Sequence, residues 1–202
     1  MRMSRTGLAI VKAFEGCLAP VKGRPGYFKA YIDPVGVLTI GYGHTNHHEP
    51  KFDSNTVWSQ QQCDEALARD MAIFEAHVSK HAKVALTQEE FDALVSWSYN
   101  TGGPETATLW RKLNAGDKAA IPAQLARWNR GGGRVLNGLT RRRKSEGELF
   151  AGKVSAAFKT AGISAPLIKP PPDTVPIAIN PAPQPSTWAA FFMALAKAFK
   201  RA

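Results

Sequence analysis

Proline spacing divides this 202-residue chain into parts that must fold differently. Eight of its 14 prolines lie between Pro166 and Pro185. A proline at every few positions removes backbone donors and blocks helix and central strand, so this stretch favours extended polyproline II structure. We therefore predict a catalytic body at residues 1–163, a semi-rigid linker at 164–186 and a separate C-terminal segment at 187–202.

The C-terminal segment has the pattern of an amphipathic, cationic helix, with large apolar residues on one stripe and basic residues at its end. About 15 residues at about 1.5 Å each cannot cross a hydrocarbon core of about 30 Å, so we expect contact with an anionic membrane surface. A helix that docks back on the body is the alternative. The residues expected to contact the membrane are Trp188, Phe191, Phe192, Leu195, Lys197, Phe199, Lys200 and Arg201.

The net charge suits a protein that acts on an anionic partner. The chain carries 26 Lys+Arg against 16 Asp+Glu, a formal charge of +10, of which +7 falls on the first 163 residues. Nucleic-acid binders are also basic, but no recognised nucleic-acid motif is present, so we expect no nucleic-acid partner. Two cysteines, Cys17 and Cys63, are too few for a disulfide framework; free thiols are the favoured interpretation, although pairing stays open.

Helical patterns dominate the body. Ser4 is suited to cap a first helix that ends at Gly16, which leaves Glu15 in the last turn. Capping boxes at Ser59 and Thr87 predict two further helices, and shorter helices follow, the last at about 141–151.

One small hairpin interrupts the helices. Asp33-Pro34-Val35-Gly36 is typical of a turn, and the alternation through Leu38, Ile40 and Tyr42 predicts a strand with Thr39 on a free face. The predicted fold class is α+β, mostly helical with one small hairpin sheet beside a cleft.

Glu15 and Asp33 together indicate glycosidase chemistry. Cleavage of a glycosidic bond needs an acid for the leaving oxygen and a second carboxylate that activates water or attacks the sugar. Glu15 suits the acid because apolar neighbours and a helix C-terminus would both raise its pKa, whereas a nearby arginine would oppose them, so the sequence leaves the net pKa open. Asp33 suits the second carboxylate, and the Thr39 hydroxyl is placed to help it hold a water. Either carboxylate alone would be unremarkable, since Asp-Pro-x-Gly is usually just a turn.

The combined motif resembles the T4-type phage lysozyme family, glycoside hydrolase family 24, over about residues 4–153. The matching segments are Glu15-Gly16, Tyr31-x-Asp33, Thr39-Ile40-Gly41-Tyr42-Gly43-His44, Ser96-Trp97-Ser98-Tyr99-Asn100-Thr101-Gly102 and Gly138-Leu139-Thr140-Arg141-Arg142-Arg143-Lys144-Ser145-Glu146. The resemblance implies a lysozyme-like fold and a mostly inverting muramidase activity. It implies Glu15 as acid, Asp33 as second carboxylate and Thr39 as the residue that positions water.

The same resemblance implies supporting roles for other residues. Substrate contacts are expected from Tyr31, Gly41, Asn100 and Gly102. His44 is expected to be structural, and Arg142 and Arg143 to support the site, one of them facing Glu15. The chain departs from the family in the step from Glu15 to Asp33, which is eighteen residues instead of the usual nine; we expect residues 19–26 to be a longer loop at the cleft edge.

These observations predict a monomeric endolysin that cleaves peptidoglycan glycan strands. The N-terminal apolar run is interrupted by Lys12 and Glu15, so we expect no signal peptide, synthesis in the host cytoplasm and holin-type release to the periplasm. His44, His47, His48 and Glu49 fall in a polar loop without a cysteine partner, so we expect no metal and no cofactor.

Two alternatives stay open from the sequence. A lytic transglycosylase cleaves the same bond but closes an anhydro ring, and therefore needs the acid without a water-holding partner. A cationic membrane-permeabilising protein would need no catalytic residue at all.

Overall fold

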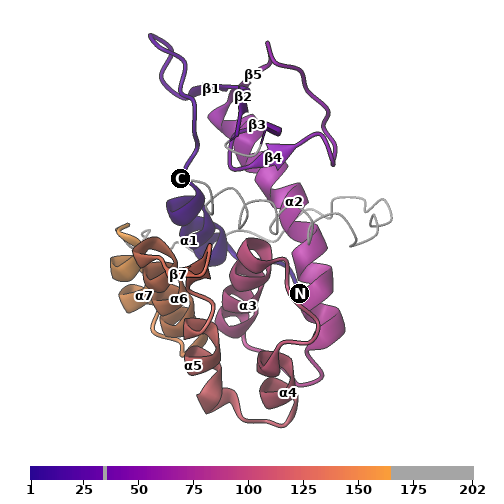
Figure 1. The fold of residues 1–202 in the computed structure, drawn as a ribbon, viewed down its shortest axis with the longest axis vertical. Helices are drawn as coiled ribbons and strands as arrows, with labels where there is room; N and C mark the ends of the chain where they lie inside the picture. Colours follow the sequence, from indigo (N-terminus) through magenta and orange to yellow (C-terminus); the bar gives the residue numbers. More distant parts are fainter. Residues whose placement is uncertain (34–35, 165–202) are drawn as a thin grey trace, which may run out of the picture.

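The computed structural model describes residues 1–33 and 36–164, and these form an α+β fold (Figure 1). The helices are α1 (Arg5–Glu15), α2 (Gln60–His81), α3 (Gln88–Thr101), α4 (Thr108–Asn114), α5 (Ile121–Ala126), α6 (Asn137–Phe150) and α7 (Val154–Ala161), with a 3-10 turn, η1 (Lys118–Ala120). The strands are β1 (Tyr27–Lys29), β2 (Tyr31–Ile32), β3 (Leu38–Ile40), β4 (His44–Thr45), β5 (Val57–Ser59), β6 (Arg130–Gly131) and β7 (Arg134–Val135). The predicted C-terminal segment, with its membrane-contacting residues, and nearly all of the predicted linker lie outside the described residues.

Helix α2 joins two lobes. Figure 1 shows strands β1 to β5 gathered at one end of α2 and helices α3 to α7 grouped toward its other end, with α1 between them. Its 22 residues span about 33 Å at 1.5 Å per residue. The Ser59 side chain and the Gln62 side chain form the predicted capping box at its start. No helix of the described part is long and apolar enough to span a membrane.

Local capping fixes where α1 starts and stops, as the sequence predicts. The Ser4 hydroxyl oxygen accepts hydrogen bonds from the Thr6 and Gly7 N–H groups at 3.1 and 3.3 Å. At the other end Gly16 has φ +65°, and its N–H donates to the Lys12 carbonyl. Because L residues with side chains rarely adopt this φ, the helix ends there and Glu15 occupies its last position.

Helix α3 forms the centre of the helical lobe. Every residue from Glu90 to Tyr99 is buried, so the helix is enclosed on all sides rather than on one stripe. Its start is the predicted capping box, in which the Thr87 hydroxyl and the Glu90 carboxylate each accept the other's backbone N–H. Trp97 is fully buried and packs edge-on against Trp110 and Trp128. This burial makes α3 a rigid base for the polar groups it carries.

The β lobe contains three short antiparallel pairings in place of one hairpin. The predicted pair β2–β3 is present, with Tyr31 opposite Thr39, and β4 extends it to three strands. The expectation that Thr39 lies on a free face is wrong: β4 covers it, with Thr45 opposite, and Thr39 is only 1% exposed. Strands β1 and β5 form a separate pair.

The extra residues between Glu15 and Asp33 form a folded β-hairpin rather than a plain loop. The Val21 N–H donates to the Tyr27 carbonyl at 2.8 Å, and the Lys29 N–H donates to the Ala19 carbonyl at 3.0 Å. Strand β1 within this hairpin then pairs with β5. The insertion is thus anchored on both sides, so it adds an edge to the lobe without displacing β2 and β3.

The structure differs from the sequence prediction at the C-terminal end of the body. Helix α6 starts at Asn137, four residues before the predicted start, and α7 was not predicted. Gly138 in the first turn of α6 lowers helix propensity, and packing of α6 against α5 and α7 outweighs it. The two-residue strands β4, β6 and β7 are too short to produce a detectable alternation.

Gly41 is a position where the β lobe leaves no room for a side chain. Its φ is +63°, and an added Cβ would lie 3.0 Å from Cys63 Sγ on α2. Gly23 has a similar φ of +76° but nothing within 4 Å of an added Cβ.

We expect Gly23→Ala to cost about 1–2 kcal/mol of unfolding free energy through φ strain alone. Gly41→Ala should cost about 1–3 kcal/mol more because of overpacking.

Urea unfolding of both variants measures this difference. Equal losses would show that the close approach of the β3–β4 turn to α2 does not constrain the lobe.

Candidate active site

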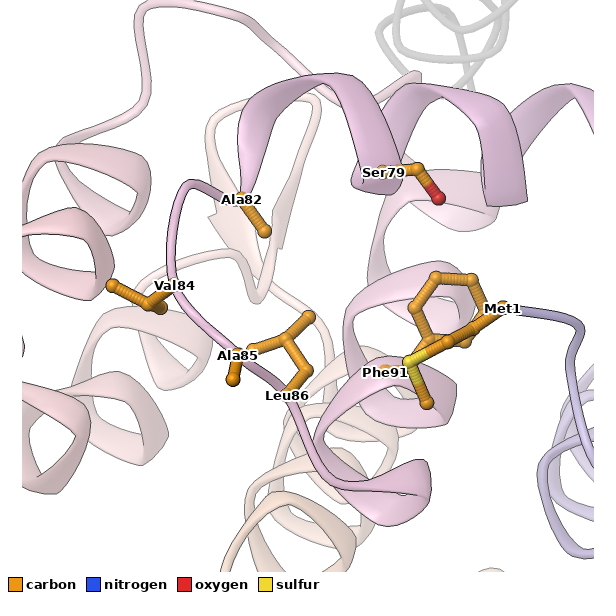
Figure 2. A pocket seen from close by; sticks show the side chains of 7 residues that line it. All are labelled: Met1, Ser79, Ala82, Val84, Ala85, Leu86 and Phe91. Atoms are coloured by element: carbon orange, nitrogen blue, oxygen red, sulfur yellow. The ribbon is translucent and has the colours of Figure 1, made fainter.

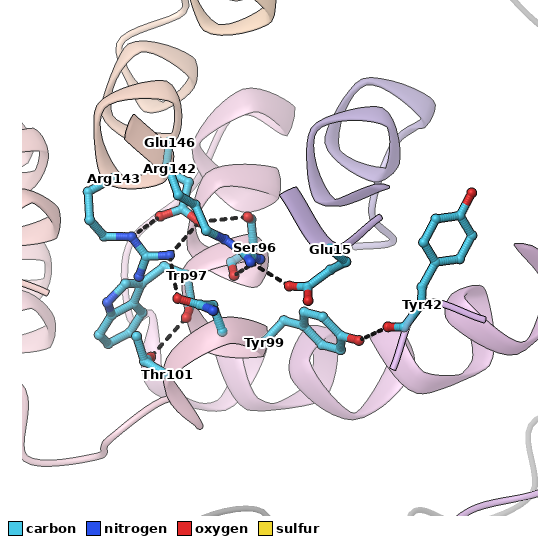
Figure 3. A network of polar contacts seen from close by, with 10 residues as sticks. Glu15, Tyr42, Ser96, Trp97, Tyr99, Thr101, Arg142, Arg143 and Glu146 are labelled. Carbon is cyan, nitrogen blue, oxygen red and sulfur yellow. Dashed lines mark hydrogen bonds and ion pairs between the residues drawn. The ribbon is translucent and has the colours of Figure 1, made fainter. Parts of the chain in front are cut away.

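Glu15 meets a buried arginine at the end of α1. Arg142 on α6 donates from Nη1 to Glu15 Oε1, an ion pair that joins residues 127 positions apart (Figure 3). The Arg142 side chain is 4% exposed and that of Glu15 is 24% exposed. The sequence prediction that one of the two adjacent arginines faces Glu15 is therefore confirmed, and that residue is Arg142.

Glu146 forms ion pairs with both arginines in the buried cluster. Its Oε1 accepts from Arg142 Nε at 3.1 Å, from Arg143 Nη2 at 3.0 Å and from the Ser96 hydroxyl at 2.7 Å. Its Oε2 lies 2.9 Å from Arg143 Nε. Since residues three and four apart share a helix face, the Arg142, Arg143 and Glu146 spacing brings these three charges together on α6.

Charge balance decides the protonation of this cluster. Burial alone would lower the pKa of Arg142, but the carboxylates of Glu15 and Glu146 outweigh it and raise the pKa. Burial lowers the pKa of Arg143 to about 10, which still leaves it charged at neutral pH. Two guanidinium groups thus face two carboxylates, and Arg142 is the member that extends from the buried centre to Glu15.

Helix α3 supplies the other polar contacts of this cluster. The Asn100 side-chain carbonyl accepts from Arg143 Nη2 at 2.9 Å, so the predicted substrate-contacting amide is partly engaged within the protein. The Tyr99 hydroxyl donates to the Tyr42 carbonyl at 2.8 Å and thereby ties α3 to the turn after β3 (Figure 3). Gly102 ends α3 with a left-handed φ of +77°.

Asp33 and Thr39 belong to one hydrogen-bonded chain in the β lobe. The Val37 N–H donates to Asp33 Oδ1 at 2.9 Å, and the Thr39 hydroxyl donates to the Val37 carbonyl at 3.1 Å. The hydroxyl proton of Thr39 is thus used internally, which leaves its oxygen as an acceptor. The structure brings together the second carboxylate and the threonine through one residue, Val37.

The charges of Asp33 and Glu15 both act on the pKa of Tyr31. Burial raises the pKa of its phenol, and the negative charges of Asp33 and Glu15 raise it further. Both carboxylates are therefore close enough to Tyr31 to act on it, one from the β lobe and one from the end of α1.

Both ring nitrogens of His44 have partners within the protein, as the expected structural role requires. Its Nδ1 lies 2.9 Å from Asp70 Oδ2 and its Nε2 lies 3.0 Å from the Pro50 carbonyl. The ring also packs near Trp58 and Phe52. Burial lowers its pKa, but the hydrogen bond and charge of Asp70 raise it by more. With both nitrogens engaged, His44 ties β4 to α2.

Gly41 and the two cysteines contribute packing. Gly41 is buried against Cys63, so the structure gives it a packing role, and its predicted substrate contact stays a prediction. Cys17 and Cys63 are free thiols, the favoured prediction. Cys63 is buried, whereas Cys17 is half-buried two residues after Glu15.

Sequence reasoning missed how Ser96, Tyr99 and Glu146 act. All three fall in the quoted motif segments, but only the fold shows that Glu146 is the shared acceptor of two arginines. The Arg-Arg-x-x-Glu spacing was the available signal, because it places both arginines within helical reach of the carboxylate.

A separate apolar hollow lies at the far end of α2. It has a volume of about 330 Å³ and is lined by Met1, Ser79, Ala82, Val84, Ala85, Leu86 and Phe91 (Figure 2). Its lining side chains include no carboxylate, imidazole or thiol, so it offers no acid or base. The chemistry therefore points to Glu15 and Asp33 rather than to this hollow.

Known proteins share this arrangement of elements. The model of the family described as phage lysozyme matches residues 13–146, which include Glu15, Asp33, Thr39 and Arg142. An endolysin of Bacillus phage B103 is 36% identical over 152 residues, which are 74% of this chain and 54% of the relative. This chain thus spans about half the length of that relative.

Two further proteins match over nearly their whole length. An endolysin of Acyrthosiphon pisum secondary endosymbiont phage 1 is 34% identical over 156 residues, 74% of this chain and 98% of the relative. The structure of the muramidase domain of SpmX from Asticaccaulis excentricus superposes with a TM-score of 0.63 at 30% identity, covering 74% of this chain and 97% of that domain.

The free energy of unfolding of two variants tests whether Glu146 balances the charge of both buried arginines. Glu146→Gln removes the carboxylate that two buried guanidinium groups share, and we expect it to lower the unfolding free energy by about 3–5 kcal/mol. Ser96→Ala removes one hydrogen bond to the same oxygen and should cost about 1.5–3 kcal/mol. Urea unfolding at pH 7 compares the two; a loss for Glu146→Gln no greater than for Ser96→Ala would contradict the shared-acceptor role.

Proposed function

This chain belongs to the phage lysozyme family, and we propose that it is an endolysin that hydrolyses peptidoglycan at the β-1,4 bond between N-acetylmuramic acid and N-acetylglucosamine. The observations that carry the proposal are the pairing of Glu15 with the buried Arg142 and the Asp33–Val37–Thr39 hydrogen-bonded chain. Similarity to two phage endolysins and to a muramidase domain supports the substrate.

Glu15 is the proposed general acid. Arg142 binds Oε1, so Oε2 is the oxygen placed to pass a proton to the leaving glycosidic oxygen when the carboxyl group of Glu15 is protonated. The guanidinium also restricts the rotamer of the carboxyl group, and accurate placement of a reacting group lowers the barrier. Because Arg142 is itself held by Glu146, the position of the acid is set by the helical lobe.

Asp33 is the proposed general base, with inversion at the anomeric carbon. It takes a proton from a water that attacks the sugar on the face opposite the leaving group, while Glu15 protonates the leaving oxygen. The Val37 N–H fixes one Asp33 oxygen, and the buried Thr39 hydroxyl donates to the Val37 carbonyl, so Thr39 supports the general base through Val37; its contact with the attacking water stays a prediction. The +7 charge of the first 163 residues favours an anionic cell-wall polymer.

Removal of the acid tests this function. We expect Glu15→Gln to lower the rate of reducing-sugar release from purified peptidoglycan by about 10²–10⁴-fold, because the amide has no proton to donate. Glu65→Gln is the matched control, since Glu65 is an exposed glutamate of α2 and should keep full activity. Circular dichroism confirms that both variants fold; a folded Glu15→Gln enzyme with more than half of the activity would contradict the proposal.

For the C-terminal segment we propose contact with an anionic membrane surface. The support is its pattern of one apolar stripe with Lys197, Lys200 and Arg201 at the end. We further propose that the protein is a monomer, made in the host cytoplasm and active on peptidoglycan after holin-type release.

Deletion of residues 187–202 tests the membrane contact. We expect the truncated enzyme to keep its activity on purified peptidoglycan but to lose most of its sedimentation with vesicles containing phosphatidylglycerol. A Phe191→Ser, Phe192→Ser double variant keeps the charge and removes two apolar groups, so it should bind more weakly than wild type. Unchanged sedimentation of the truncated enzyme would contradict the proposed role.

A further inference from the structure

Two histidines and a glutamate converge at the end of α2 that lies farthest from the β lobe. His77 and His81 are one turn apart, and their ring centroids are 4.4 Å apart. Glu105 joins them from the loop between α3 and α4. One ligand atom of each residue lies within 4.8 Å of the others. We propose that His77, His81 and Glu105 bind a zinc ion at a site distinct from the Glu15 site.

The Nε2 atoms of the two imidazoles have only loose contacts within the protein, which a metal ion could replace. The Nε2 atoms of His77 and His81 are both buried, and neither makes a well-formed hydrogen bond. A Cβ at position 103 would lie 2.6 Å from His77 Nε2, so the backbone of Gly103 packs close to this nitrogen and only the missing side chain leaves space beside it. His81 Nε2 lies 3.3 Å from Glu105 Oε1, which places the carboxylate oxygen beside the pair.

The donor set and its geometry suit zinc. Zinc prefers imidazole nitrogen at about 2.0–2.1 Å and carboxylate oxygen at about 2.0–2.2 Å in a tetrahedral arrangement, which sets donor atoms about 3.4 Å apart. Donors that lie within 4.8 Å must come closer by at most about 1.4 Å to reach that spacing. The Glu105 side chain is 58% exposed and can make that movement. Calcium and magnesium are disfavoured because they take oxygen ligands in larger number.

Trp110 and Lys80 are the neighbouring residues expected to affect zinc binding. Trp110 packs beside both imidazoles, with ring centroids 5.7 and 5.5 Å away, and restricts their orientation. Lys80 Nζ lies 3.2 Å from Glu105 Oε1 and must give up this contact when a cation binds. Lys80 therefore competes with the metal. Zinc in this position would fasten the last turns of α2 to the loop before α4.

The test uses the full-length chain without a histidine tag. Calorimetric titration with zinc should give one site per chain with micromolar or tighter affinity. Cobalt, used as a spectroscopic substitute, should give the visible absorption of a tetrahedral complex. Bound zinc should also raise the thermal unfolding midpoint, because the native state binds it and the unfolded chain does so less well.

Variants locate the ion. We expect His81→Gln and Glu105→Gln each to weaken zinc binding by at least about tenfold, because each removes one of three ligands. Glu105 is exposed, so its variant should fold even if a histidine variant does not. Lys80→Met should bind zinc more tightly than wild type because the competing ammonium is gone. A His47→Gln, His48→Gln double variant in the other histidine-bearing loop should bind like wild type.

Two results would overturn the proposal. One is the absence of zinc binding tighter than about 100 μM, an affinity near −5.5 kcal/mol. The other is binding that survives Glu105→Gln and His81→Gln but is lost in the His47→Gln, His48→Gln variant, which would place the ion elsewhere.

Discussion

The burial of two adjacent arginines is the constraint on which the rest of the site depends. Arg142 and Arg143 are almost fully enclosed, and an uncompensated guanidinium in such surroundings would cost several kcal/mol. Glu146 meets both, and Glu15 meets Arg142 at the surface of the cluster. Helix α6, which carries the cluster, packs against α3, α5 and α7, and Glu146 binds Arg142, which in turn positions the carboxyl group at the end of α1.

The second half of the site is fixed by a different lobe. Asp33 and Thr39 are joined through Val37 within short strands, and His44 and Gly41 hold the following turn against α2. The Tyr99–Tyr42 hydrogen bond then connects that turn to α3. In the proposed mechanism the acid thus comes from the end of α1, held by the helical lobe, and the base comes from the β lobe.

Local chemistry was predictable from the sequence, whereas most long-range contacts were not; the contact between an arginine and Glu15 was predicted only through the family resemblance. Ser4 and Gly16 determine the ends of α1 through caps, so the position of Glu15 at a helix end followed from neighbouring residues alone. The burial of Thr39 depends on strand β4, and the role of Glu146 depends on α3. Two of the three residues proposed to bind zinc, His77 and His81, can be recognised in the sequence by their helical spacing. Glu105 lies in a distant loop that only the fold brings close to them.

Product analysis tests the central claim, hydrolysis by Glu15 with water activated at Asp33, most directly. Peptidoglycan digested by the wild-type enzyme is separated and examined by mass spectrometry. The account predicts fragments that end in reducing N-acetylmuramic acid and carry the mass of one added water. Fragments that end in 1,6-anhydro-N-acetylmuramic acid would show a transglycosylase that uses no water, and would contradict the roles given to Asp33 and Thr39.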